Sequence, residues 1–313
     1  MTKEVLLATH QRIKPFIHRT AVLTSSQINT ISGCEVFFKC ENFQKMGAFK
    51  MRGATNAILC LSEEDRKKGV VTHSSGNFAQ AVALAAASLN VHADIVMPKN
   101  APVVKKNAVL DYGGNVIESE STAIAREEMA DQVQQEKGAS FLHPSNQDEV
   151  IFGQGTAAME LLEDQPDLDF IITPVGGGGL IAGTALAAHY FGKNCKVIGG
   201  EPAEADDAYR SLQSGKIETN ATANTIADGL RTFLGDRNFP IIQKYVDRIV
   251  LVEENEIIEA MKLIWERMKI IIEPSSAVAF AALLKQKDQF KNKKVGVIIS
   301  GGNVDLTDLP FNK

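Results

Sequence analysis

Lys50 stands in surroundings that could support covalent chemistry. The segment around it, residues 47–53, reads Gly-Ala-Phe-Lys-Met-Arg-Gly, so its charge lies among small and apolar residues. A lysine amine has an ordinary pKa of ~10.4, which makes it a poor nucleophile at neutral pH. Burial or a cationic neighbour lowers that pKa, and the neutral amine can then condense with a carbonyl compound. Taken alone, Lys50 also fits an ordinary surface charge.

Four consecutive glycines form the second chemical feature: Gly176, Gly177, Gly178 and Gly179. An apolar segment precedes them and an alanine-rich segment follows, which predicts a strand, a glycine loop and a helix in that order. Bare backbone N–H groups beside a helix N-terminus suit an anion, so we predict a phosphate-binding loop. A tight turn with positive φ is the alternative, although four glycines exceed what one turn needs.

The identity of the phosphate ligand stays open at this point. Gly177, Gly179 and Ala182 fit the spacing of the dinucleotide fingerprint. A strand that ends at Glu201 also places an acid about where a ribose would be bound. This pattern would make the protein a nicotinamide oxidoreductase. Against it, the loop lies in the second half of the chain and other segments indicate a different cofactor.

An acidic cluster follows the same strand. Glu201, Glu204, Asp206 and Asp207 lie within seven residues. One interpretation is a solvated loop with acids at a helix N-terminus, where the helix dipole favours them. Two carboxylates and a backbone carbonyl at this spacing could also bind a hard cation together with several waters.

Strands and helices must position these groups, and short apolar runs alternate with longer helical patterns along the chain. Strands are predicted at residues 35–39, 70–72, 93–97, 115–117, 141–143, 170–174, 196–199, 248–251 and 295–300. Helices are predicted at residues 76–87, 101–110, 121–135, 154–162, 180–190, 255–268 and 274–285. The alternation predicts an α/β protein with parallel-rich sheets that helices cover on both faces.

Composition limits the classes of partner. Acidic residues outnumber basic ones by 38 to 33, which argues against a nucleic-acid-binding surface. The N-terminal apolar run, residues 5–8, is too short for a signal peptide or a membrane span, so no membrane partner is expected. The 4 cysteines form no CxxC pair and no zinc spacing. We expect free thiols in a reducing cytoplasm.

Four segments in chain order resemble the fold-type II pyridoxal-phosphate (PLP) enzymes. Residues 47–53 resemble their Schiff-base lysine motif, and residues 73–77, His-Ser-Ser-Gly-Asn, resemble the loop at the cofactor hydroxyl. The tetraglycine resembles their phosphate cup, and residues 300–303, Ser-Gly-Gly-Asn, their pyridine-nitrogen loop. Within that family the chain is most similar to serine racemases and serine/threonine dehydratases. The segments at 201–207, 226–229, 265–269 and 272–274 carry this further resemblance.

The resemblance implies a reaction and two catalytic residues. Lys50 would move a proton on one face of the substrate, and Ser75 would act on the opposite face. Racemisation needs an acid–base group on each face. Ser75 therefore favours a serine racemase with accompanying β-elimination of serine or threonine, since catabolic threonine dehydratases commonly carry alanine there. Relatives that act on hydroxyaspartate share Ser-Ser-Gly-Asn, so a threonine or 3-hydroxyaspartate dehydratase stays an alternative.

The resemblance also implies four sets of binding residues. The cofactor residues are Phe49, Lys50, Asn77, Ser145, Gly176, Gly177, Gly178, Gly179, Gly229 and Ser300. The substrate residues are Ser74, Ser75, Asn77 and Arg126. The ligands of a divalent cation (Mg, Mn or Ca) are Glu201, the Ala205 carbonyl and Asp207. The residues of an ATP effector site are Ser25, Ser26, Lys45, Gln80, Tyr112, Lys269 and Asn303.

The chain departs from the family pattern at three positions. Phe78 follows the loop asparagine where animal serine racemases have histidine, and it cannot hydrogen-bond a substrate carboxylate. Ser145 and Met46 replace an asparagine and a hydroxyl residue. Arg126 also fits a surface ion pair with its glutamate neighbours, and His73 fits a core histidine better than a base.

The implied fold has two domains, as in the tryptophan synthase β type. Residues 1–66 and 147–313 would form the large domain, residues 67–146 the small one, and the chain would form a homodimer. A non-catalytic amino-acid or nucleotide sensor on the same scaffold is a further alternative. Intact Lys50 and Ser75 argue against it.

Overall fold

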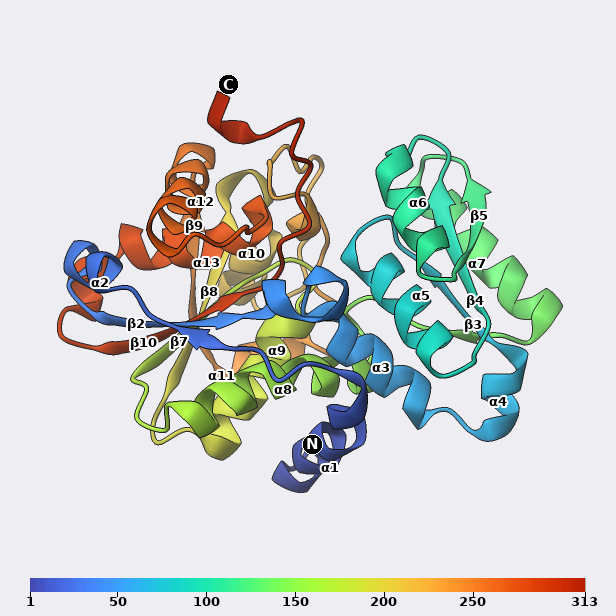
Figure 1. Ribbon diagram of the computed structural model, residues 1–313, viewed down its shortest axis with the longest axis horizontal. Helices are drawn as coiled ribbons and strands as arrows, with labels where there is room; N and C mark the ends of the chain where they lie inside the picture. The colour runs from blue at the N-terminus through green and yellow to red at the C-terminus, as the bar shows by residue number, and fades with distance from the viewer. Residues whose placement is uncertain (313) are drawn as a thin grey trace.

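The computed structural model describes residues 1–312, and its strands form two sheets that lie side by side (Figure 1). The strands are β1 (Val22–Leu23), β2 (Glu35–Cys40), β3 (Val70–His73), β4 (Ala93–Pro98), β5 (Asn115–Ser119), β6 (Ser140–Phe141), β7 (Phe170–Pro174), β8 (Lys196–Pro202), β9 (Val246–Val252) and β10 (Lys294–Ile299).

Helices lie between most of these strands. They are α1 (Lys3–Ile13), α2 (Ser26–Ser32), α3 (Lys50–Cys60), α4 (Glu63–Lys68), α5 (Asn77–Ser88), α6 (Val103–Asp111), α7 (Ala123–Lys137), α8 (Asp148–Asp164), α9 (Gly179–Phe191), α10 (Asp207–Ser214), α11 (Phe239–Tyr245), α12 (Glu254–Met268) and α13 (Pro274–Lys285). Short 3-10 turns include η3 (Lys45–Gly47), η4 (Ala203–Ala205) and η5 (Asp228–Leu230). Within residues 1–312 no helix is both long and apolar enough to cross a bilayer.

The larger sheet has the strand order β1-β2-β10-β7-β8-β9, and every pair except β1–β2 is parallel. Helices α12 and α13 pack on one face, and α8, α9 and α11 lie on the other (Figure 1). Burial on both faces explains the continuous apolar runs of β7, β8 and β10. The α/β prediction with parallel-rich sheets is confirmed.

The smaller sheet has the order β5-β4-β3-β6 and is parallel throughout. Val70 packs in the core with α5, whereas its neighbour Val71 packs with α7 on the opposite face. The strand expected at 141–143 is instead β6, residues 140–141. Leu142 still accepts a hydrogen bond from Thr72 Oγ1 at 2.7 Å, but the chain then turns away at His143.

Candidate active site

Lys50 is the first residue of α3 and lies where the two sheets meet. The amide of Phe49 donates to the Ser300 carbonyl at 2.9 Å, which ties the start of the helix to the end of β10. The Lys50 Nζ donates to the Pro144 carbonyl at 2.7 Å. It also lies 5.1 Å from the centre of the Phe49 ring and 5.5 Å from that of Phe78.

These surroundings disfavour a charged amine. Burial lowers the Lys50 pKa to about 8, and the Glu273 carboxylate opposes that shift. A substantial fraction of the amine is therefore neutral near physiological pH, as attack on a carbonyl requires.

A buried ionic cluster, Arg52, Glu41, Glu160 and Lys39, anchors α3 below the lysine. Arg52 donates to Glu41 Oε2 at 2.7 Å and to Glu160 Oε2 at 2.8 Å. Lys39 Nζ donates to Glu160 Oε2 at 2.7 Å. All four side chains are buried, and two cations balance two carboxylates. Sequence reasoning missed this cluster, because its members come from β2, the 3-10 turn η2 (Glu41–Phe43), α3 and α8.

The glycine loop has the form of an anion cradle. None of the amides of Gly176, Gly177, Gly178 and Gly179 donates a hydrogen bond to another residue within 1–312. Gly178 has a φ of +80°, which favours glycine. A Cβ atom at Gly177 would lie 2.5 Å from Ser145 Oγ, so a side chain there would fill the space beside the loop. Free amides at the start of α9 fit a phosphate.

Two side chains that sequence reasoning missed support this region: Asn238 binds the glycine loop itself, and Ser275 binds the neighbouring Gly229. Asn238 Nδ2 donates to the Gly177 carbonyl at 2.8 Å and to the Ser145 carbonyl at 3.3 Å. Gly229 donates its amide to Ser275 Oγ at 3.1 Å. Gly229 is also close to the loop, since a Cβ at Gly176 would lie 3.1 Å from its carbonyl oxygen.

The serine loop lies between β3 and α5. The Ser74 amide donates to the Val96 carbonyl at 3.2 Å, and the Gly76 amide donates to Ser74 Oγ at 3.4 Å. The half-buried Ser75 side chain makes no hydrogen bond to the described part of the chain. Its hydroxyl is therefore available to a substrate.

Asn77 and Glu273 join the serine loop to the start of α13. Asn77 Nδ2 donates to Glu273 Oε1 at 2.9 Å and to Oε2 at 3.1 Å, and Asn303 Nδ2 donates to Asn77 Oδ1 at 2.9 Å. Burial raises the Glu273 pKa to about 7, against the hydrogen bond from Asn77. Ser300 is buried, with its Oγ 2.9 Å from Ser276 Oγ.

The acids of the cluster have different surroundings: Glu204 is exposed, Asp206 pairs with Arg210, and Glu201 and Asp207 are buried. Glu201 accepts the amides of Ala208 at 2.8 Å and Tyr209 at 2.7 Å, at the start of α10. Asp207 Oδ1 accepts from Asn220 at 2.7 Å, whereas its buried Oδ2 has no partner in the described chain. Burial raises the pKa of both acids, that of Asp207 to about 7, and the Asp207 charge adds to the shift of Glu201.

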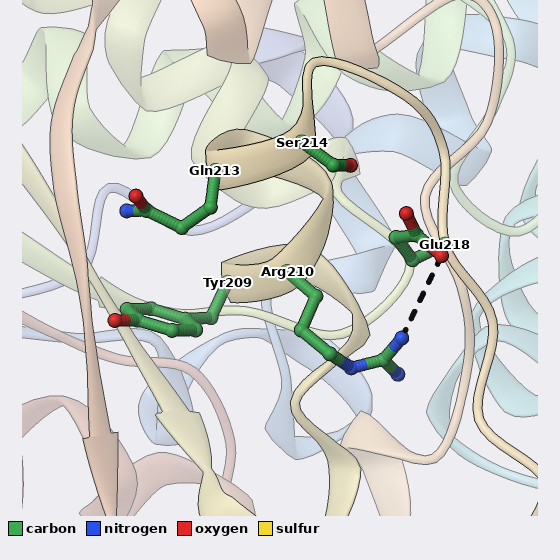
Figure 2. A pocket seen from close by; sticks show the side chains of 5 residues that line it. All are labelled: Tyr209, Arg210, Gln213, Ser214 and Glu218. Atoms are coloured by element: carbon green, nitrogen blue, oxygen red, sulfur yellow. Dashed lines mark ion pairs between the residues drawn. The ribbon is translucent and has the colours of Figure 1, made fainter.

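This chemistry fits a hard cation, with the Ala205 carbonyl close by in sequence. No group of three or more His, Cys, Asp or Glu side chains with metal-binding geometry occurs among residues 1–312. A cation would therefore need the carbonyl and water as further ligands. The surface hollow nearest in sequence is lined by Tyr209, Arg210 and Glu218, among others (Figure 2). Arg210 pairs there with Glu218 at 3.7 Å.

The contacts of Arg126, His73 and Glu201 decide three further interpretations. Arg126 forms no ion pair within residues 1–312, so the surface-pair interpretation is wrong, and its Nε contacts only the Thr122 carbonyl at 3.4 Å. His73 stacks on Phe141 with ring centres 5.2 Å apart, as a core histidine would. The dinucleotide interpretation of Glu201 is also wrong, because its carboxylate is buried against backbone amides.

The predicted effector residues lie on several elements of the described chain. Asn303 Nδ2 donates to the Met46 carbonyl at 2.8 Å, next to Lys45. Lys269 ends α12 with a φ of +60°, and Gln80 is buried in α5. Ser25 and Ser26 begin α2, whereas Tyr112 follows α6, at the opposite end of the long axis (Figure 1).

A buried amine with a lowered pKa, a loop of free backbone amides and an available hydroxyl suit an amine-reactive cofactor with a phosphate group. Comparison with known proteins agrees. The sequence pattern of the pyridoxal-phosphate dependent enzyme family matches residues 13–301. Serine racemase of Dictyostelium discoideum is 52% identical over 313 residues, covering 99% of this chain and 97% of that protein.

Two further comparisons give the same family. The β-hydroxyaspartate dehydratase of Paracoccus denitrificans is 47% identical over 311 residues, covering 99% of each chain. The crystal structure of the Dictyostelium serine racemase superposes with a TM-score of 0.94 at 53% identity, covering 98% of this chain and 99% of that one. The chain belongs to the family of pyridoxal-phosphate dependent enzymes.

Proposed function

We propose that the protein is a PLP-dependent serine racemase that interconverts L- and D-serine, with accompanying β-elimination of serine and threonine to a 2-oxo acid and ammonia. Two observations carry the proposal: burial lowers the Lys50 pKa to about 8, and the half-buried Ser75 hydroxyl makes no hydrogen bond within residues 1–312. Similarity to serine racemases over nearly the whole chain supports it.

The predicted cofactor and catalytic residues have separate roles in the proposed reaction. When bound, PLP supplies an electron sink for the bond broken at the substrate Cα. The amides of residues 176–179 would hold its phosphate, and Phe49 and Ser300 would contact its ring and ring nitrogen. Ser145 and Gly229 line the phosphate loop. Lys50 would accept the Cα proton on one face, and Ser75 would donate its own hydroxyl proton to Cα on the opposite face, with the roles exchanged in the reverse direction.

The same proton transfers explain the side reaction. A substrate with a hydroxyl on Cβ can lose water once its Cα proton has been removed. The protein then has to protonate the leaving hydroxyl, and a general acid at the site serves both reactions. Ser74, Asn77 and Arg126 complete the proposal as substrate-binding residues. Glu273 orients Asn77 through two hydrogen bonds.

A second candidate function is the dehydration of threo-3-hydroxyaspartate with little racemisation. The 47% identity to a β-hydroxyaspartate dehydratase favours it. Phe78 is buried with its ring centre 5.5 Å from the Lys50 nitrogen, and it cannot bind a substrate carboxylate as a histidine could, so in either function other residues must bind that carboxylate.

A divalent cation (Mg, Mn or Ca) bound by Glu201, the Ala205 carbonyl and Asp207 is part of the proposal. The unpartnered Asp207 Oδ2 and the raised pKa values support it, because a cation would compensate both buried charges. EDTA treatment should lower activity and melting temperature. No change in either would remove the cation from the proposal.

We further propose ATP as an effector and a homodimer as the active species. Ser26 begins α2 and Tyr112 follows α6, and these helices lie at opposite ends of the long axis (Figure 1), so one site that uses both residues would need two copies of the chain. The domain division at residues 67 and 146 and a cytoplasmic location, consistent with free cysteines, complete the proposal. Serine dehydration with and without Mg-ATP tests the effector.

Chiral product analysis tests the main proposal. The enzyme would be given L-serine, L-threonine and L-threo-3-hydroxyaspartate in turn. We expect D-serine and pyruvate from L-serine and 2-oxobutyrate from L-threonine. Rapid elimination from hydroxyaspartate with no D-serine from L-serine would instead establish the second candidate.

A further inference from the structure

The turn at residues 143–147 connects β6 to α8 and touches both halves of the candidate site. His143 begins it, and its amide donates to Gln147 Oε1 at 3.1 Å. The His143 Nδ1 lies 3.1 Å from the Ser145 amide and 2.8 Å from the Asn146 amide. One imidazole nitrogen thus meets two backbone donors.

This geometry determines the protonation of the ring. Because both neighbours of Nδ1 are N–H donors, Nδ1 must be the acceptor and the single proton must lie on Nε2. An imidazolium would turn Nδ1 into a third donor facing two others. Burial lowers the His143 pKa to about 4, and the charges of His73 and Lys50 add to that shift, while Asp236 opposes it.

The turn presents one group to each part of the site. Its Pro144 carbonyl accepts the hydrogen bond from Lys50 Nζ at 2.7 Å. Its Ser145 side chain lies against the phosphate loop, 2.5 Å from where a Gly177 Cβ would stand. Asn146 accepts the Arg237 amide at 2.8 Å, which holds the far side of the turn.

We infer that His143 is a positioning residue, whose neutral ring fixes the 143–146 turn so that Pro144 holds the Lys50 amine and Ser145 closes the phosphate loop. The inference deepens the proposed function and rests on it only in taking Lys50 as the reacting amine. Sequence reasoning gave no role to this histidine. Its contacts are to backbone amides, which leave no signal in side-chain spacing.

Long-range proton–nitrogen NMR of protein labelled at its 6 histidines tests the protonation state directly. The PLP-loaded protein would be titrated from about pH 5.5 to 8, and signals absent from the His143→Asn variant would be assigned to His143. We expect an unprotonated Nδ1 and a protonated Nε2 throughout. A proton on Nδ1, or titration near the ordinary value of ~6.5, would overturn the inference.

Two variants test the consequence. Asparagine can accept the same two amides through its side-chain oxygen, as in an Asx turn, whereas leucine cannot. We expect His143→Leu to weaken PLP binding at least about tenfold, and His143→Asn to stay within about threefold of the parent. Equal weakening by both variants, or by neither, would contradict the role.

Neither measurement uses a substrate. If racemisation were absent but the NMR and PLP-binding results held, only the proposed function would fail. If racemisation were found but His143 carried its proton on Nδ1, only this inference would fail.

Discussion

The chemistry depends on the amine of Lys50, which makes no direct ion pair within residues 1–312. Its nitrogen donates to a carbonyl and lies beside two aromatic rings, while Glu273 acts on it only through its charge. Because the Lys50 amine is buried and Glu273 compensates its charge only in part, the pKa of the amine stays low. The same carboxylate that orients Asn77 therefore also tunes the lysine.

Uptake of PLP by cofactor-free protein should follow the ionisation of Lys50. Because only the neutral amine reacts, we expect the rate to rise with pH and to reach half its maximum near pH 8. Glu273→Gln removes the charge that raises this pKa, so its midpoint should be lower. Stopped-flow absorbance measures both, and a parent midpoint near ~10.4, the value of an exposed lysine, would contradict the burial argument.

Ser75→Ala removes one of the two proposed acid–base groups. We expect D-serine formation from L-serine to fall by about 10²–10⁴-fold, which is the usual contribution of a general acid–base group. Dehydration of L-serine, which needs Lys50 but not a second face, should stay within about tenfold. Chiral chromatography and pyruvate assays would measure the two rates. Undiminished racemisation in the variant would refute the two-base scheme.

Some site residues could be predicted from sequence and others could not. Lys50 and the glycine loop lie in contiguous motifs whose residue types carry their chemistry, so they were found. Asn238 acts on backbone atoms of another segment, and His143 acts on backbone amides two and three residues away; neither contact leaves a pattern of side-chain types in the sequence. Glu273 lay in a recognised segment, yet its contact with Asn77 spans 196 residues.

At the scale of elements, the buried ionic cluster joins α3 to β2 and α8. Arg52→Met would leave Glu41 and Glu160 buried without their main partner. We expect the free energy of unfolding to fall by about 3–5 kcal/mol. Arg19→Met is the matched control, because its pairs with Glu163 and Asp164 are exposed and should contribute less than about 1 kcal/mol. Urea denaturation measures the free energy of unfolding of both variants. Equal losses would contradict a larger contribution from the buried cluster.

The junction of β8 and α10 predicts a pH-dependent response to cations. Since the folded-state pKa of Asp207 is raised to about 7, the folded protein binds more protons than the unfolded chain below that pH. Without a cation, stability should therefore fall as pH rises from about 5 to 7.5. Magnesium should raise the melting temperature more at the higher pH.

Two variants control this thermal measurement. Asp207→Asn should abolish the magnesium response, and Glu204→Gln should preserve it because Glu204 is an exposed acid of the same turn. A response that survives in Asp207→Asn would place the cation elsewhere.

Strands and helices were predicted correctly where a buried apolar pattern defines them, and a helix was missed where tertiary packing stabilises it. Strands β7 and β10 and helix α13 have apolar patterns that match their surroundings, and the bounds of β7 and α13 are as predicted. Helix α3 was missed because Gly53, Thr55 and Asn56 lower its helix propensity. Its packing against α8 overrides that preference, and Gly53 and Gly153 make the close approach possible.

For the whole molecule, the candidate site exists only because the two sheets meet. Lys50 contacts Pro144, Asn77 contacts Glu273, and Lys105 of α6 pairs with Asp228 of η5 at 2.6 Å. Each of these pairs joins the segment of the smaller sheet to residues outside it. The alternation of strands and helices predicts both sheets, but not which of their ends face each other.

The central claim is that Lys50 carries the cofactor. Purified protein incubated with PLP should absorb near ~410 nm and lose that band on borohydride reduction. Peptide mass spectrometry of the reduced protein should then find the pyridoxyl group on Lys50 and on no other lysine. A colourless protein that takes up no PLP, or an adduct that maps to another lysine, would contradict the account.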